Sequence, residues 1–172
     1  MDFTRDWHSS RQKLWASWMA ELVATPCQYL EIGVYEGRSL LWMLDSVLTH
    51  EQSTATAVDM WADPDTERRF DRNLAESGHS PKVRKLKAPS RHALRWLPFA
   101  SFDVVYVDGS HEGRDVLEDA VLAYPLVKRG GLMIFDDVEN KRYDVAAGLD
   151  PFLSLWPVEV IHRAWQVALK IK

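Results

Sequence analysis

The segment "YLEIGVYEGRS" at residues 29–39 joins a short apolar run to two glycines four positions apart. A short apolar run that ends in a glycine turn predicts a buried β-strand. The next segment, "SLLWMLDSVL" at 39–48, is apolar nearly all round, as expected of a helix packed between a sheet and other elements. The stretch therefore predicts a strand, a glycine turn and a helix.

The same order recurs along the chain. We expect an amphipathic helix at 10–24, strands at 54–60, 83–88, 102–109 and 132–137, and helices at 65–78, 90–97 and 113–127. Asp65 is the expected N-cap of the helix at 65–78, and Gly130 and Gly131 are expected to form a turn before the strand at 132–137. The tail, "VEVIHRAWQVALKIK" at 158–172, holds two strand-like segments and predicts an antiparallel hairpin.

Alternating apolar strands and helices predict an α/β fold. We expect a Rossmann-like, doubly wound and mostly parallel sheet with helices on both faces and the hairpin at its C-terminal end. The prediction is a single domain over 1–172, with an N-terminal helix within 1–27, a core at 28–138, and a C-terminal helix and hairpin at 139–172.

The amino-acid composition limits the classes of partner that we expect for the chain. The chain has 172 residues, 47% hydrophobic and 27% charged, with a net charge of −4, so neither a nucleic acid nor an anionic membrane is the expected partner. A single cysteine, Cys27, excludes an internal disulfide or a cysteine-based zinc site. No secretory signal or membrane-length apolar run is visible, so the prediction is a cytoplasmic protein.

Polar residues follow every predicted parallel strand. After the first strand these residues are Glu31 to Arg38, and the later groups are Asp59 to Trp61, Lys87 to Ser90, Asp108 to His111, and Asp136 with Asp137. Ligands of doubly wound sheets bind outside the carboxyl ends of the strands. The sequence therefore predicts a binding site that is rich in carboxylates.

The first turn departs from the usual dinucleotide pattern. Gly33 and Gly37 give G-x-x-x-G after the acid Glu31, where a dinucleotide fold would show G-x-G-x-x-G. An acid here suits a cationic or hydrogen-bond-donating ligand better than a pyrophosphate, although a tight turn without a ligand explains the pattern equally well. Asp59, after the second strand, is placed to accept the hydroxyls of a ribose. The alternative for Asp59 is a cap of the next helix, for which Asp63 and Asp65 are nearer.

Three segments resemble successive motifs of class I S-adenosylmethionine-dependent methyltransferases: "YLEIGVYEGRSLLWML", "AVDMW" and "FDVVYVDGSHEGRDVLEDAVLAYPLVKRGGLMIFDDV". More narrowly, they resemble the group of macrolide-sugar O-methyltransferases and cephalosporin hydroxylase-like proteins, over about residues 28–138. The resemblance implies that Glu31, Gly33 and Gly37 surround the amino-acid part of S-adenosylmethionine and that Asp59 holds its ribose. It also implies that Met60 and the segment Ala88 to Ser90 flank the adenine, with Asp108 beside the cofactor.

A second cluster suggests catalysis. Asp108, Asp136 and Asp137 follow adjacent predicted strands, and carboxylates brought so close repel unless they are protonated or bridged by a cation such as Mg²⁺, Ca²⁺ or Mn²⁺. Both Asp136 and Asp137 can reach one ion only if the chain turns there. The resemblance implies Mg²⁺ at these acids. His111 is then a candidate base acting with Asp108, or alternatively a cap of the next helix. We assign no role to the other five histidines, which include His8.

The predicted function is S-adenosylmethionine-dependent methyl transfer, metal-assisted, to a hydroxyl of a sugar or small natural product. The alternatives are an accessory protein that binds the cofactor without turnover, and a metal-dependent enzyme of another class. A nitrogen or carbon acceptor also stays open. The N-terminal helix, the segment around Trp61 or a neighbouring subunit in a homo-oligomer could each cover the site.

Overall fold

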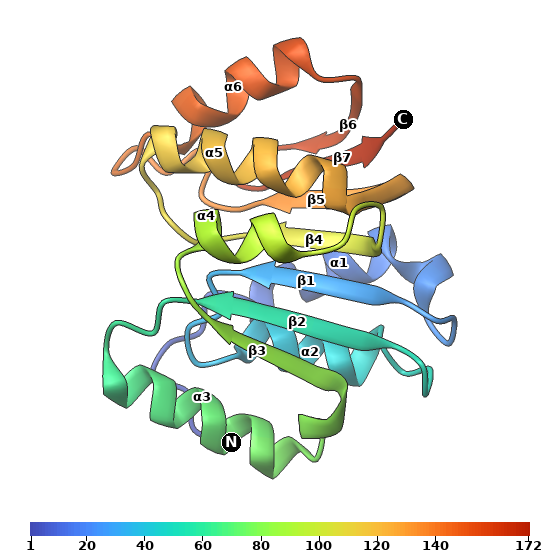
Figure 1. Ribbon diagram of the computed structural model, residues 1–172, viewed down its shortest axis with the longest axis vertical. Coiled ribbons are helices and arrows are strands. Elements are labelled where there is room, and N and C mark those ends of the chain that lie inside the picture. The colour runs from blue at the N-terminus through green and yellow to red at the C-terminus, as the bar shows by residue number, and fades with distance from the viewer.

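A computed structural model describes residues 1–172 and contains one seven-stranded sheet with the order β3-β2-β1-β4-β5-β7-β6 (Figure 1). The strands are β1 (Gln28–Ile32), β2 (Thr54–Asp59), β3 (Val83–Lys87), β4 (Phe102–Val107), β5 (Val127–Phe135), β6 (Val158–Arg163) and β7 (Val167–Ile171). Strands β1 to β5 pair in parallel, whereas β7 is antiparallel to both β5 and β6. The predicted fold class, including the C-terminal hairpin, is confirmed.

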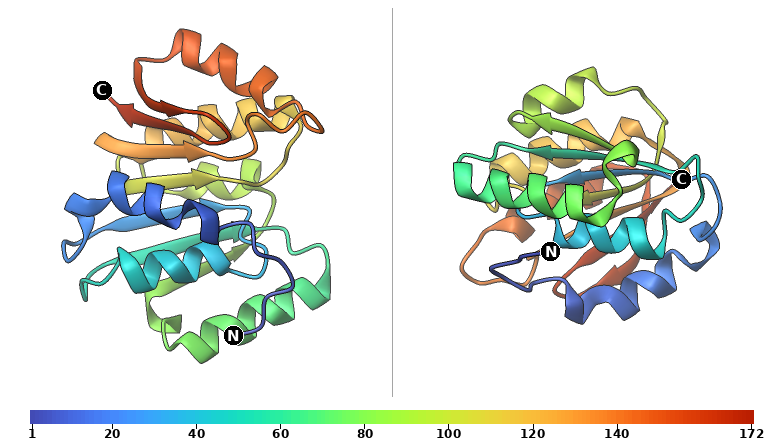
Figure 2. Two further views of the ribbon diagram at one scale, coloured as in Figure 1. Left: turned by 180° about the vertical axis from the view of Figure 1, so that it is seen from behind. Right: turned by 90° about the horizontal axis from the view of Figure 1, so that it is seen from below.

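Helices cover both faces of the sheet (Figures 1 and 2). They are α1 (Gln12–Trp18), α2 (Arg38–Ser46), α3 (Pro64–Ser77), α4 (Ser90–Ala93), α5 (Gly113–Ala123) and α6 (Val145–Leu155). Single 3₁₀ turns are η1 (Ser9–Arg11), η2 (Ala20–Leu22), η3 (Ser80–Lys82), η4 (Leu94–Trp96) and η5 (Tyr124–Leu126). No helix is both long and apolar enough to span a membrane.

Two hydrophobic clusters form the core, one on each face of the sheet. One cluster packs α4, α5 and α6 against the sheet, and the other packs α1, α2 and α3 against the opposite face. Strand β1 contributes to both, because Leu30 and Ile32 enter the first cluster and Tyr29 enters the second. Burial on both faces explains why the central strands are apolar throughout rather than alternating.

The strand order reverses between β1 and β4. The chain leaves β1 towards β2 and β3 on one side and returns through β4 and β5 on the other. The loops after β1 and β4 therefore diverge to opposite faces and leave a crevice at the carboxyl ends of the strands. Every group of polar residues noted after the parallel strands lies at this edge.

Three local predictions are corrected by the structure. The helix expected at 10–24 is the helix α1 flanked by the 3₁₀ turns η1 and η2. Apolar residues three apart suit both kinds of helix, so their spacing does not separate them. The N-cap of α3 is Asp63, not Asp65, because the Asp63 carboxylate accepts the N–H of Asp65.

The two glycines near 130 lie inside β5 rather than in a turn before it. Phe102 of β4 pairs with Val127, but Val104 pairs with Leu132, so extra residues of β5 bulge out between these pairs. Gly130 has φ +78°, which permits the bulge. Two consecutive glycines are compatible with a turn or with a bulge. Here the register of β5 against β4 produces the bulge.

Candidate functional site

A cavity of about 860 Å³ opens at the carboxyl ends of the parallel strands. Its wall contains most of the predicted site residues, namely Gly33, Asp59, Met60, Ala88, Ser90, Asp108, His111, Asp136 and Asp137. Two predicted cofactor residues, Glu31 and Gly37, are not on the wall. The volume is in the range that holds a cofactor-sized ligand.

The two glycines of the first turn are required by protein contacts. Gly33 has φ +84°, and a Cβ atom there would lie 2.0 Å from the backbone oxygen of Asp108. Gly37 has φ +87° and lies against the ring of Phe70, which a Cβ would meet at 3.0 Å. The first glycine thus lets the loop after β1 touch the end of β4, and the second begins α2.

Glu31 lies beneath the glycine turn and is fully buried. Its carboxylate accepts hydrogen bonds from the hydroxyls of Tyr29, at 2.7 Å, and Ser39. Burial raises the pKa of Glu31 to about 8, although these two hydrogen bonds act in the opposite direction. Ser39 is on the cavity wall, so Glu31 reaches the cavity only through the Ser39 hydroxyl.

Asp59 ends β2 and supports the loop after β1. Its Oδ2 accepts the N–H groups of Val34 and Tyr35 at 2.8 and 2.9 Å, and its Oδ1 accepts that of Trp61 at 2.7 Å. A carboxylate offers about four lone-pair positions, so one acceptor position is free for a ligand hydroxyl. Asp59 is not a cap of α3, which uses Asp63.

Next to Asp59, the cavity wall includes the apolar side chain of Met60. Met60 is 57% exposed there, beside Ala88 and Ser90 from the loop after β3. Behind Ser90, the carboxyl of Asp119 on α5 is almost fully buried and also lines the cavity. Burial raises the pKa of Asp119 to about 6, with the Ser90 hydroxyl acting against the shift. Sequence reasoning missed Asp119 because it lies within a helix and not at a strand end.

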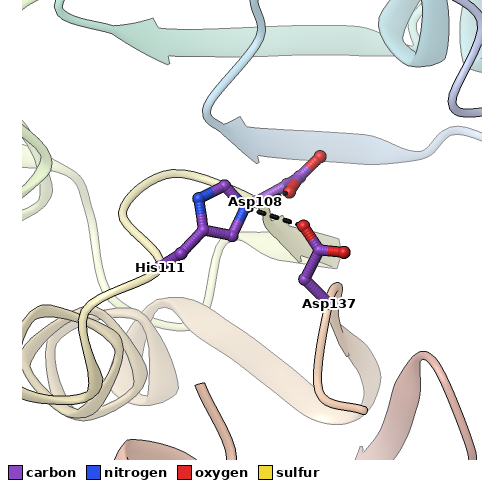
Figure 3. A group of neighbouring side chains, drawn as sticks. All are labelled: Asp108, His111 and Asp137. Carbon is purple, nitrogen blue, oxygen red and sulfur yellow. Dashed lines mark ion pairs between the residues drawn. The ribbon is translucent and has the colours of Figure 1, made fainter. Parts of the chain in front are cut away.

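Asp108, His111 and Asp137 form a group at the ends of β4 and β5 (Figure 3). Nε2 of His111 lies 2.9 Å from Oδ2 of Asp137 and 3.6 Å from Oδ1 of Asp108. One ligand atom from each residue fits within 4.8 Å of the others. The loop after β4 thus carries His111 back over the strand end, as Figure 3 shows.

The chain turns between Asp136 and Asp137, which separates their roles. Asp137 has φ +58° and points towards His111, so it leaves the regular alternation of β5. Asp136 instead accepts hydrogen bonds from Tyr106 at 2.5 Å, from Gln166 at 2.8 Å and from the N–H of Asp137 at 2.7 Å. Asp136 is therefore outside the group that contains Asp108, His111 and Asp137.

Burial and neighbouring charges shift the pKa values of this group. Displacement of water raises the pKa of Asp108 to about 7, with the neighbouring His111 and the hydrogen bond of Tyr106 opposing the shift. The nearby carboxyl of Asp108 raises the pKa of His111, and the charge of Asp137 adds to this effect. The Tyr106 hydroxyl is also 3.0 Å from Asp108, and its single proton can serve only one of the two carboxylates at a time.

The N-terminal segment closes one side of the cavity. The sequence had offered three candidates for this cover and did not decide among them. Thr4 donates to the buried carboxylate of Glu36 through its N–H at 2.7 Å and through its hydroxyl at 2.8 Å. The Trp7 ring lies 5.3 Å from that of Tyr35. Further residues of this segment on the cavity wall are Phe3, Arg5, Asp6, His8, Ser10 and Arg11. Sequence reasoning missed them because nothing near Thr4 indicates contact with Glu36.

Comparison with known proteins shows a family. A model described as "Methyltransferase domain" matches residues 30–138, which is more than half of the chain. A curated relative, "Uncharacterized protein R132" of Acanthamoeba polyphaga mimivirus, is 28% identical over 121 residues. That alignment covers 67% of this chain and 53% of the relative, so the chain spans about half the length of the relative it matches.

Solved structures share the fold over nearly the whole chain. A "putative O-methyltransferase from Klebsiella pneumoniae" has a TM-score of 0.76 at 17% identity, covering 99% of this chain and 83% of its own. An SAH-bound Podospora anserina methyltransferase has a TM-score of 0.72 at 19% identity, covering 92% and 78%. By the family match and this shared fold, the chain belongs to the methyltransferase domain family and has the class I, S-adenosylmethionine-dependent methyltransferase fold.

Proposed function

We propose that the protein is an S-adenosylmethionine-dependent O-methyltransferase that acts on a hydroxyl of a sugar or small natural product with the help of a hard divalent cation. The observation that carries this proposal is a single cavity whose wall joins the glycine turn and Asp59 to Asp108, His111 and Asp137. A methyl donor and a hydroxyl acceptor must meet in one enclosed space for transfer to occur.

Each end of the cavity suits one part of the cofactor. The free acceptor position on Asp59 suits a ribose hydroxyl, and the exposed Met60 with Ala88 and Ser90 suits the flat adenine. Asp108 lies beside Gly33, where a carboxylate favours the cationic amino and sulfonium groups. Glu31 acts by orienting Ser39, and Gly37 by starting α2, so both shape the pocket from behind its wall.

The acid cluster fits a divalent cation. Carboxylate oxygens of Asp108 and Asp137 can approach one point together with a nitrogen of His111, and oxygen ligands suit Mg²⁺ or Mn²⁺. In this proposal Asp108 and Asp137 hold the ion, while Asp136 supports them through Tyr106. A bound divalent cation would offset the charge of the carboxylates and lower the pKa of an acceptor hydroxyl.

His111 is the proposed base. Its Nε2 faces Asp137 in the group, and its ring stacks on Tyr143 with centroids 4.2 Å apart, which fixes the plane of the imidazole. His111 accepts the proton of the acceptor hydroxyl at a ring nitrogen as the oxygen attacks the methyl carbon and the carbon–sulfur bond breaks. The products are a methyl ether and S-adenosylhomocysteine.

Isothermal titration of the protein with S-adenosylmethionine and S-adenosylhomocysteine, each with and without Mg²⁺, tests the proposal. We expect dissociation constants on the order of micromolar for both ligands. Absence of binding under every condition would contradict the proposal. If binding occurs, transfer of a labelled methyl group to a hydroxylated acceptor would separate an enzyme from an accessory binding protein. That transfer should require Mg²⁺ or Mn²⁺ and should be lost with a chelator.

A further inference from the structure

Two polar groups on one turn of the N-terminal segment have no partner. His8 precedes η1 and Arg11 ends it, and both line the cavity. His8 is only 5% exposed, and neither its Nε2 nor the Nε of Arg11 has a hydrogen-bond partner. Buried polar atoms in folded proteins are nearly always paired. Because both residues also line the cavity, a ligand or an ordered water there can supply the missing partner.

The two residues face the same way. Arg11 donates its N–H to the backbone oxygen of His8 at 2.8 Å, and side chains three apart on a 3₁₀ turn lie above one another. The His8 ring packs against both Trp15 and Trp42, with ring centroids 4.7 and 5.2 Å away. The two tryptophans thus fix the position of the imidazole, one 3₁₀ turn before Arg11.

Arg11 makes no ion pair, although carboxylates line much of the cavity. Arg38, by contrast, lies 3.5 Å from Asp6 and donates to the backbone oxygen of Arg5. The guanidinium of Arg11 lies instead over the ring of Trp165, 5.7 Å from its centroid. A guanidinium with free donors is the side chain best suited to bind an oxyanion.

This turn lies on the acceptor side of the cavity. The backbone oxygen of Trp165 accepts the N–H of Val138, which directly follows Asp137. Trp165 itself is 36% exposed and lines the cavity, so part of its side chain can contact a ligand next to the guanidinium. A group bound at Arg11 would therefore be on the side of the proposed acid cluster, away from Met60 and Ala88.

The segment that carries the turn is anchored. Asn73, fully buried on α3, exchanges two hydrogen bonds with the backbone of Asp2, and Thr4 donates twice to Glu36 within the glycine turn. These contacts fix the segment before it reaches His8. The orphaned pair is thus presented by a held structure and not by a loose end.

We propose that His8 and Arg11 form an acceptor subsite that binds an oxyanion, carboxylate or phosphate, of a ring-bearing hydroxylated acceptor whose ring packs on Trp165. This rests on the proposed function and narrows its acceptor to an anionic class. The guanidinium pairs with the oxyanion, the His8 imidazole adds a hydrogen bond, and the hydroxyl to be methylated extends towards His111.

Three small probes of similar shape test the subsite: 4-hydroxybenzoate, 4-hydroxyphenylphosphonate and the neutral 4-hydroxybenzamide. Each is titrated into the protein with and without S-adenosylhomocysteine. We expect at least one anion to bind about tenfold more tightly than the amide. Arg11→Gln should abolish this preference and Arg11→Lys should keep part of it. His8→Phe retains an aromatic ring and should weaken binding of the anion about threefold to tenfold.

Lys13→Gln is the matched control, because it removes one positive charge from an exposed position of α1 away from the cavity, and it should behave as the unmodified chain. Equal affinity for all three probes, absence of binding of the anions, or an unchanged preference in Arg11→Gln would overturn the inference. Binding of S-adenosylhomocysteine without an anion preference overturns the subsite alone. An anion preference without cofactor binding keeps the subsite and overturns the proposed function.

Discussion

Two acid-rich regions lie at the same edge of the sheet but use their carboxylates differently. In the turn after β1, the carboxylates of Glu31, Glu36 and Asp59 all accept hydrogen bonds from protein donors. At the ends of β4 and β5, Asp108 and Asp137 face each other across His111. Acids in the first region are held by protein donors that shape the loop after β1, whereas Asp108 and Asp137 lie against the ring of His111.

The difference follows from the donors within reach. The turn after β1 supplies backbone N–H groups and the start of α2, and the N-terminal segment supplies Thr4, so each acid there finds a partner. At the ends of β4 and β5, the main hydroxyl donor is Tyr106, which is shared between Asp108 and Asp136. Carboxylates that lie close together with few shared donors repel each other unless one is protonated or a cation lies between them.

Gly33→Ala breaks the contact between the two regions and has the largest expected effect. Residue 33 has φ +84°, and the alanine Cβ would lie 2.0 Å from the backbone oxygen of Asp108. The turn and the end of β4 must therefore move apart. We expect a loss of about 4 kcal/mol or more in the free energy of unfolding, measured with urea. Gly78→Ala is the control, because it has φ +77° but meets no atom within 4 Å. Equal losses in both variants would show that backbone conformation, not the contact, requires Gly33.

Glu31→Gln tests whether the buried acid of the turn affects the stability of the fold. The pKa of Glu31 is about 8 in the folded protein and about 4.5 in the unfolded chain, so between these values the folded state binds more protons. Stability therefore falls as pH rises from 5 to 8, by on the order of 2 to 4 kcal/mol from this group. The variant should lose that part of the pH dependence in unfolding measurements.

The exposed Glu139→Gln serves as the control for this pH dependence and should keep the slope of the unmodified chain. A slope in Glu31→Gln as steep as that of the unmodified chain would mean that another buried acid, such as Asp119, causes the change.

Asp137→Asn tests whether the second region binds a cation. Asparagine tolerates φ +58°, so the variant should keep the backbone while it loses one charged ligand. We expect Mn²⁺ affinity, followed by electron paramagnetic resonance, to fall about 10-fold to 100-fold, with cofactor affinity unchanged. Undiminished Mn²⁺ binding in this variant would remove Asp137 from the ion site. Glu139→Gln again gives the charge control.

Asp59→Asn has the smallest expected effect and probes the first region from the cavity side. An amide in place of the carboxylate sets an N–H₂ group against the N–H groups of Val34, Tyr35 or Trp61 and disturbs the loop that faces the cofactor. We expect S-adenosylmethionine to bind about tenfold more weakly by isothermal titration. Asp63→Asn, which removes the same charge at the N-cap of α3, should leave the affinity unchanged.

The sequence by itself determined the fold class and the edge that carries the site. Apolar runs, glycine turns and helical periodicity are local signals, and they sufficed for the parallel strands, the C-terminal hairpin and the helices on both faces. Topology then required the acids after each strand to gather at one edge. The predicted site residues Asp59, Asp108, His111 and Asp137 all line one cavity at that edge.

Only the tertiary structure decided what each side chain touches. Strand periodicity does not reveal that Gly33 must touch the backbone of Asp108, that the chain turns at Asp137, or that Asp136 lies with Tyr106 and Gln166. The closure of the cavity by the N-terminal segment likewise depends on Glu36, 32 positions from Thr4, and on Asn73, 71 positions from Asp2. Local propensity encodes the elements, whereas contacts between distant residues are settled only when the elements pack.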